Sequence, residues 1–212
     1  MNERYKSKIP NYICEKYEII EWKNAIAVLR CEHPNEWDNL LSVLSNFQLS
    51  KDNILTPGGN KSPIARSING MFNELGWHET AFDITIRITH KEAHPGRRRT
   101  EVCGETEYQV PTHHVDYYKN KVAIETEWNN KDPFFDRDLN NFRILYEYGV
   151  IDVGIIITRS WQLEELLRSL GKGASYGRNT THMDKLKPRI FSNASGGCPV
   201  LAFGITSKLY VK

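Results

Sequence analysis

Apolar and polar residues alternate over residues 121–128, and this alternation predicts a β-strand. A helical pattern follows over residues 136–148. It leads into an almost unbroken apolar run at residues 150–158, which is typical of a strand buried on both faces of a sheet. Strand, helix and buried strand in this order predict a βαβ-like unit of an α/β fold.

Further elements are predicted on both sides of this unit. Strands are predicted at residues 82–88 and 199–205 and at residues 108–118, where Pro111 interrupts the strand. Residues 16–22 form either a short strand, which we favour, or the start of a helix. Helices are predicted at residues 25–30, 36–44, 63–75 and 161–170. Residues 49–63 and 90–104 are rich in turn-forming or charged residues and are predicted to be loops. Residues 172–197 are polar and basic and show no pattern of a helix or strand; the segment is too long for a plain connector and is therefore either functional or mobile. We therefore expect a mixed β-sheet flanked by helices, in a single domain that spans residues 1–212.

Two carboxylates, Glu125 and Glu127, share one face of the predicted strand at residues 121–128. Like charges this close repel each other, which destabilises a fold unless a cation joins them. The buried strand that follows argues against a solvated edge, and ligands collect at strand ends in α/β sheets. Asp116 lies before a turn at residues 117–121, so a hairpin would bring it beside Glu125. Three converging carboxylates predict a site for a hard cation, most simply Mg²⁺.

Composition excludes several classes of protein. The chain has 212 residues, of which 40% are hydrophobic and 25% charged, as expected for a soluble globular protein. Its four cysteines lie far apart without a CxxC pair, which argues against a zinc knuckle and a disulfide framework. Since we see neither a leader segment nor an apolar run of membrane-spanning length, we expect a cytoplasmic protein with no membrane partner.

The net charge of +2 does not decide whether the chain binds nucleic acid, but the basic residues are clustered. Candidates for contact with DNA phosphates are Lys61, Arg66, Arg97, Arg98, Arg99, Lys172, Arg178, Lys185, Lys187 and Arg189. Residues 177–182 also contain Asn179 beside Arg178, the residue types that contact base edges. His114 is predicted to share a strand face with Asp116 and is a further candidate for phosphate contact. His113 would point to the opposite face, so the two histidines are not expected to bind one ion together.

The acidic pattern resembles a known motif. Asp116, eight residues and then Glu125-x-Glu127 on an alternating strand resemble the active-site motif of the PD-(D/E)XK nucleases, in the variant that has Glu or Gln in place of Lys. The helix and the sequence IDVGIII follow, and Gly76-Trp77-His78-Glu79 stands upstream. With these surroundings, residues 64–205 resemble the type II restriction endonucleases of the BglII/BamHI/BstYI kind.

This resemblance implies a restriction-endonuclease-like fold and a homodimeric enzyme that depends on Mg²⁺, with Mn²⁺ as a substitute. Such an enzyme cuts both strands of a short DNA palindrome and leaves 5′-phosphate and 3′-hydroxyl ends. A cognate DNA methyltransferase is implied as a genetic rather than a physical partner. Asp116 and Glu125 would be metal ligands, Glu127 would take the third motif position, and Glu79 the auxiliary acidic position. Glu127 cannot supply positive charge as Lys would; it either activates the attacking water or helps to bind the metal.

Three other functions stay open at this point. A structure-specific repair or junction nuclease on the same core would cut at branches or damage whatever the sequence. A non-catalytic DNA-binding module is disfavoured by the acidic residues, since carboxylates facing a polyanion do not help binding. A phosphohydrolase for small nucleotides would not need an extended basic surface.

Overall fold

The computed structural model describes residues 7–57, 62–96 and 99–211 of the chain. The chain divides into two compact units, one formed by Met1–Thr80 with Val115–Lys212 and the other by Ala81–His114. We call them the core unit and the hairpin unit. The expectation of a single domain stays a prediction. Lys61, Arg97 and Arg98, which were predicted to contact DNA, lie outside the described residues.

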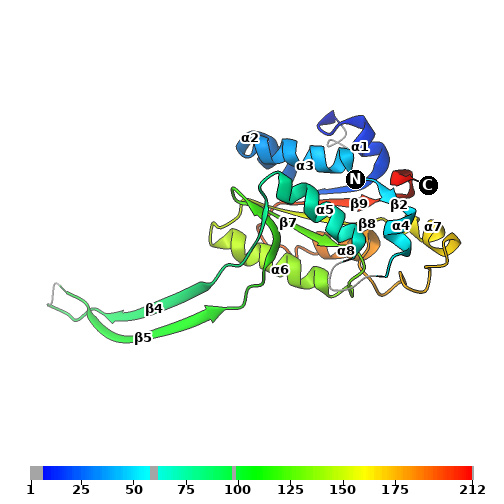
Figure 1. Cartoon of the computed structure of the whole chain (residues 1–212). Coiled ribbons are helices and arrows are strands. Elements are labelled where there is room, and N and C mark those ends of the chain that lie inside the picture. The colour runs from blue at the N-terminus through cyan, green and yellow to red at the C-terminus, as the bar shows by residue number, and fades with distance from the viewer. Residues whose placement is uncertain (1–6, 58–61, 97–98, 212) are drawn as a thin grey trace. The chain divides into compact units, whose positions relative to one another are not determined.

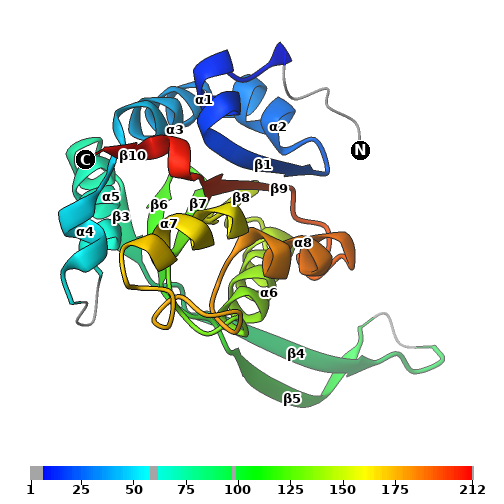
Figure 2. The same ribbon diagram turned by 90° about the vertical axis from the view of Figure 1, so that its right-hand side faces the viewer.

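The core unit contains a six-stranded mixed sheet in the order β1-β9-β8-β7-β6-β3, whose strands are labelled in Figure 2. Its three central strands run parallel: β7 (Val122–Glu127), β8 (Val153–Arg159) and β9 (Val200–Ile205). The flanking strands pair antiparallel: β1 (Tyr17–Trp22) with β9, β6 (Val115–Lys119) with β7, and β3 (His78–Thr80) with β6. The predicted mixed sheet is confirmed.

Helices cover both faces of this sheet (Figures 1 and 2). One face packs on a core that includes α2 (Ala25–Glu32), α3 (Pro34–Asn46) and α5 (Pro63–Glu74). Val122 and Ile124 of β7 point into that core. The other face carries α6 (Phe134–Glu147) and α8 (Met183–Phe191). Ala123, Glu125 and Glu127 alternate with the first set, so they face α6.

The predicted βαβ unit is present as β7, α6 and β8, with every residue of both strands buried. A tight turn precedes it, in which Asn120 and Lys121 have φ values of 44° and 65°. Positive φ at two successive residues suits a two-residue hairpin, because the twist of such a turn matches that of the strands. This turn fixes the register of β6 against β7, pairing Tyr117 with Ile124.

Three segments for which we predicted no helix or strand contain regular structure. Residues 49–63 include β2 (Leu49–Ser50) and α4 (Lys51–Leu55), where the Ser50 hydroxyl accepts a hydrogen bond from Asn53 N at 3.1 Å and caps the helix. Residues 172–197 include α8, which follows η2 (Trp161–Leu163) and α7 (Glu164–Ser169). These elements were missed in the sequence because their residues are mostly turn-forming or basic. Such polar residues also occupy the exposed faces of short helices, so they do not by themselves indicate a loop.

The predicted loop at residues 90–104 is wrong for a different reason. It contains the ends of two long strands, β4 (Ile84–Glu92) and β5 (Glu101–Val110), which pair antiparallel and form the hairpin unit. The strand predicted at residues 108–118 with an interruption at Pro111 is two strands, β5 and β6, which end and begin on either side of that proline. His113 and His114 therefore lie in the connection between strands, and their predicted placement on opposite strand faces is wrong.

The hairpin unit has one apolar and one polar face. Cross-strand pairs place Ile86 beside Tyr108 and Ile84 beside Val110, whereas Arg87 on the other face contacts Glu107 at 3.2 Å. Ile88 and Tyr108 are 53% and 54% exposed. Because both faces of much of the ribbon meet solvent, polar residues are tolerated along its outer part, and its sequence does not alternate there as a half-buried strand would. None of the helices in the described parts of the chain is long and apolar enough to span a membrane.

Candidate active site

Glu125 and Glu127 lie inside the molecule, on the central strand of the core sheet. Their exposed fractions are 1% and 2%, so the solvated-edge alternative for this pair is excluded. Glu127 Oε2 accepts a hydrogen bond from Asn130 Nδ2 at 2.7 Å, which orients the carboxyl group. Charged side chains are seldom buried unless they are paired or bind a metal, so each of these carboxyl groups requires either a cationic partner or a bound proton.

The tight turn between β6 and β7 places Asp116 beside Glu125, as predicted from their spacing. Asp116 N donates a hydrogen bond to Glu125 Oε2 at 3.4 Å, and Asp116 Oδ2 accepts one from Thr126 N at 2.9 Å. Asp116 is half-buried. The hairpin therefore holds the third carboxylate at the same part of the sheet as Glu125, although its Oδ2 is turned toward the backbone of β7.

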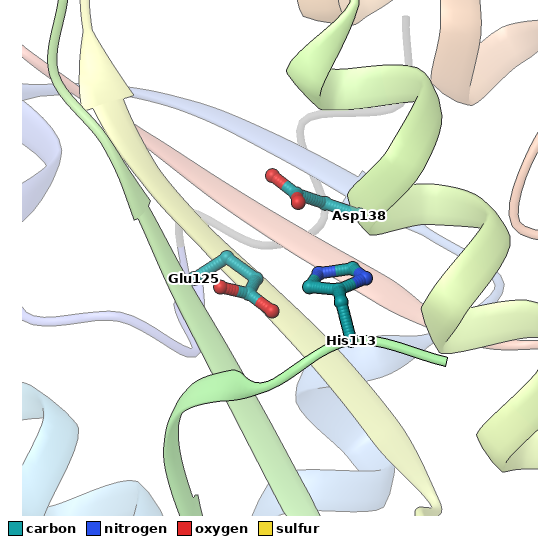
Figure 3. A group of neighbouring side chains, drawn as sticks. All are labelled: His113, Glu125 and Asp138. Atoms are coloured by element: carbon teal, nitrogen blue, oxygen red, sulfur yellow. The ribbon is translucent and has the colours of Figure 1, made fainter. Parts of the chain in front are cut away.

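A fourth carboxylate, Asp138, comes from α6 and was missed in the sequence. Its side chain is fully buried, and carboxylate oxygens of Asp138 and Glu125 lie within 4.8 Å of each other. Figure 3 shows these two side chains on α6 and β7; His113, drawn in the same view, belongs to the hairpin unit. A signal was present in the sequence, because Asp138 occupies a position among Phe135, Leu139 and Phe142 on the apolar face of the helix. An acidic residue on such a face requires a partner.

Arg137 brings positive charge to these acids. Its Nε and Nη2 atoms donate to Asp138 Oδ1 at 3.1 and 2.9 Å, and Nη2 lies 3.5 Å from Glu127 Oε1. Burial lowers the pKa of Arg137, but Asp138 and Glu127 raise it, and the net direction is upward. The acids around Arg137 therefore favour its protonated form.

The crowding of carboxylates changes the protonation of Glu127. Burial raises the pKa of Glu127 most, the nearby Asp138 raises it further, and the hydrogen bond from Asn130 lowers it, with a net value of about 9. Burial beside Asp138 therefore favours the protonated form of Glu127 in the metal-free protein. A divalent cation at this site would favour the ionised form and release that proton.

We expect the free energy of unfolding of the metal-free protein to fall as pH rises from about 4.5 to about 9. Over this range Glu127 is protonated in the folded protein and ionised in the unfolded chain, whose carboxyl has the ordinary pKa of 4.5. The folded state then binds more protons, so raising the pH favours unfolding, by at most about 1.4 kcal/mol per pH unit for one group. Urea unfolding in EDTA across this range measures the slope. Glu127→Gln should lose this contribution; an equal slope in both proteins would contradict the assignment.

Glu79, the candidate for the auxiliary acidic position, is exposed on β3. It lies at a bulge in the pairing of β3 with β6, close enough to Tyr117 to contribute to the raised pKa of that phenol, which is caused mainly by burial. Glu79 is thus adjacent to the strand of Asp116 and is not part of the buried group formed by Glu125, Glu127 and Asp138.

The predicted DNA-binding residues fall into different environments. Arg66 on α5 is exposed, as are Arg99 and His114 of the hairpin unit. Lys185, Lys187 and Arg189 lie on α8, where Arg189 donates to both oxygens of Asp136 at 2.8 and 3.0 Å and Lys185 lies 3.6 Å from Asp132. Arg189 therefore holds α8 against the start of α6, a role that its position in a basic cluster did not indicate.

Arg178 and Asn179 are exposed on a segment that is attached to the end of β7. Thr181 N donates to Asn130 O at 2.8 Å, and Asp132 N donates to Asn179 O at 3.2 Å. The fully buried Arg159, at the end of β8, donates to Thr180 Oγ1 at 2.8 Å. The structure thus brings the predicted base-contacting segment beside the loop that directly follows Glu127.

A mixed sheet flanked by helices, with buried carboxylates on its central strand, is consistent with a nuclease of the restriction-endonuclease-like fold. The sequence model of one family, described as restriction endonuclease BglII/BglIII, matches residues 17–205. The chain belongs to this family and is a type II restriction endonuclease, a nuclease whose substrate is DNA. No individual curated protein matches the chain.

Proposed function

We propose that the protein cuts both strands of duplex DNA at a short palindromic sequence in a reaction that depends on Mg²⁺. The observation that carries this proposal is the burial of Glu125 and Glu127 on the central strand, with Asp116 beside them. Carboxylate oxygens are the donors that Mg²⁺ prefers, and a cluster of buried acids gains stability when a cation binds. The donor set therefore fits the metal.

Asp116 and Glu125 would hold the metal, with Glu127 as a third ligand or as the group that orients the attacking water. A bound divalent ion lowers the pKa of a coordinated water and offsets the charge on the phosphate. Glu127 is held from two sides by Asn130 and Arg137, so its carboxyl group is kept in place for either role. Water adds to phosphorus as the bond to O3′ breaks, and O3′ takes up a proton. The products are a 5′-phosphate and a 3′-hydroxyl.

A palindromic site predicts a two-fold symmetric dimer, because each half-site presents the same surface to one subunit. Arg178 and Asn179 are the candidates for base contact, since they project from a segment bound to the loop after β7. Arg66 and Lys187 of the core unit and Arg99 of the hairpin unit are candidates for phosphate contact. We also expect a DNA methyltransferase of the same specificity to be encoded with the enzyme.

Incubation of the purified protein with unmethylated phage DNA tests the proposal. We expect discrete bands with Mg²⁺ or Mn²⁺ and intact DNA with EDTA. The ends should be ligatable directly and lose this property after phosphatase treatment, because ligation needs the 5′-phosphate. A metal-dependent smear would instead favour a structure-specific or non-specific nuclease. Uncut DNA that is nevertheless bound would favour a non-catalytic binding module.

A further inference from the structure

The acidic site lacks a cation on its own strand. Hydrolysis of a phosphodiester adds negative charge to the phosphate oxygens in the transition state, and a fixed positive group near them stabilises that state. The third motif position, which a lysine occupies in many related nucleases, holds Glu127. Positive charge in addition to a metal must therefore come from another element.

Arg137 has the position and the geometry to supply this charge. Arg137 lies near the start of α6. Its guanidinium lies 3.5 Å from Glu127 Oε1, on the side of the sheet where Glu125 and Asp138 approach each other. Its carbon Cζ also lies 4.4 Å from the centre of the Phe134 ring, which supports the group from one side. The guanidinium is thus oriented by two neighbours on its own helix.

The same guanidinium is open to a ligand. The pairing with Asp138 uses two of the five N–H groups of the guanidinium, and the Arg137 side chain is 45% exposed. Asp138 and Glu127, by contrast, are buried. A cation that only balanced the charge of buried acids would be buried together with them. The Arg137 side chain instead extends from the buried acids to the solvent-exposed surface.

We propose that Arg137 is a further catalytic residue, which contacts the scissile phosphate and supplies the fixed positive charge that Glu127 cannot. Asp138 is its positioning residue. Arg137 takes no proton in the reaction: it hydrogen bonds to a non-bridging phosphate oxygen while water adds to phosphorus and O3′ leaves. This role rests on the proposed cleavage of DNA.

A double-mutant cycle separates this role from simple charge balance. The variants are Arg137→Met, Asp138→Asn and the combination of both, with Arg143→Met as a matched control. Arg143 is an exposed arginine of the same helix that bonds to Asn140. Single-turnover cleavage with Mg²⁺ gives the rate of the chemical step, and binding of the same DNA with Ca²⁺ in place of Mg²⁺ gives Kd.

We expect Arg137→Met to cut roughly 100- to 1,000-fold more slowly, as for loss of one donor that stabilises transition-state charge. Its Kd should change little, Arg137→Lys should recover part of the rate, and Arg143→Met should cut like the wild type. The double variant should remain at least about 10-fold slower than Asp138→Asn alone. It also keeps the test decisive if Arg137→Met does not fold, because it removes the buried charge of Asp138 together with the cation.

If Arg137 only balances Asp138, its removal costs nothing once Asp138 is neutral, so equal rates for the double variant and Asp138→Asn would overturn the inference. Wild-type cleavage by Arg137→Met would overturn it as well. Failure of the proposed function is seen separately, because the wild-type protein would then leave the DNA uncut in every metal.

Discussion

Replacing Glu125 by Gln should abolish cleavage and leave a folded protein that is more resistant to heat. The amide keeps the shape of the side chain but is a poor ligand for Mg²⁺, so we expect the single-turnover rate to fall by at least about 100-fold. At the same time the variant removes one of several carboxylates that repel each other in a buried site. Relief of about 1 kcal/mol would raise Tm by roughly 2–4 °C for a chain of this size.

The two effects are measured on the same preparation, by single-turnover cleavage with Mg²⁺ and by thermal unfolding in EDTA. Glu165, which is exposed on α7, provides the matched control. Glu165→Gln should change neither the rate nor Tm appreciably. If Glu125→Gln cut at the wild-type rate, the carboxylate could not be a metal ligand; if it lost both activity and stability, the loss of activity would have a trivial cause.

Replacing Gly154 by Ala should produce the largest loss of stability among conservative changes in the core unit. A Cβ atom at this position of β8 would lie 2.3 Å from Cδ2 of Phe142, in the packed layer between the sheet and α6. An aromatic ring in a full core cannot swing aside, so the strand or the helix must shift. We expect a loss of about 1–3 kcal/mol in the free energy of unfolding, measured by urea denaturation.

Gly70→Ala is the control for this change. Gly70 lies within α5, and a Cβ atom there would meet no other atom within 4 Å. Alanine has the higher helix propensity, so this variant should gain roughly 0.5–1 kcal/mol. Adding Phe142→Leu to Gly154→Ala should recover part of the loss by making room. A stable Gly154→Ala protein would show that the layer between β8 and α6 is looser than the structure indicates.

Local patterns were sufficient to predict the central part of the fold. The apolar run at residues 150–158 and the helix before it gave the β7, α6 and β8 unit, since a buried strand needs a nearly continuous apolar sequence. Residues that meet solvent on both faces carry no such pattern. The outer halves of β4 and β5 were therefore mistaken for a loop, and α8 was not recognised in a basic segment.

The acidic residues that could be predicted from the sequence are those on β6 and β7, which are joined by a tight turn. The distance along the chain from Asp116 to Glu125 is short, and a tight turn converts it directly into a contact. Asp138 and Arg137 reach the same place through the packing of α6 on the sheet, which spacing along one strand does not reveal. The acidic residue on the apolar face of α6 was nevertheless visible in the sequence.

The pairing of β1 with β9 joins two segments that lie far apart in the sequence, since Tyr17 lies opposite Ile205. While the protein is being synthesised, β1 emerges from the ribosome early and has no partner until β9 follows. The edge of β8 that β9 covers stays open for the same time. Contacts between residues so far apart in sequence form late and slowly. Translation proceeds at roughly 5–20 residues per second. The order of strands therefore leaves the sheet incomplete until residues 200–205 have been made.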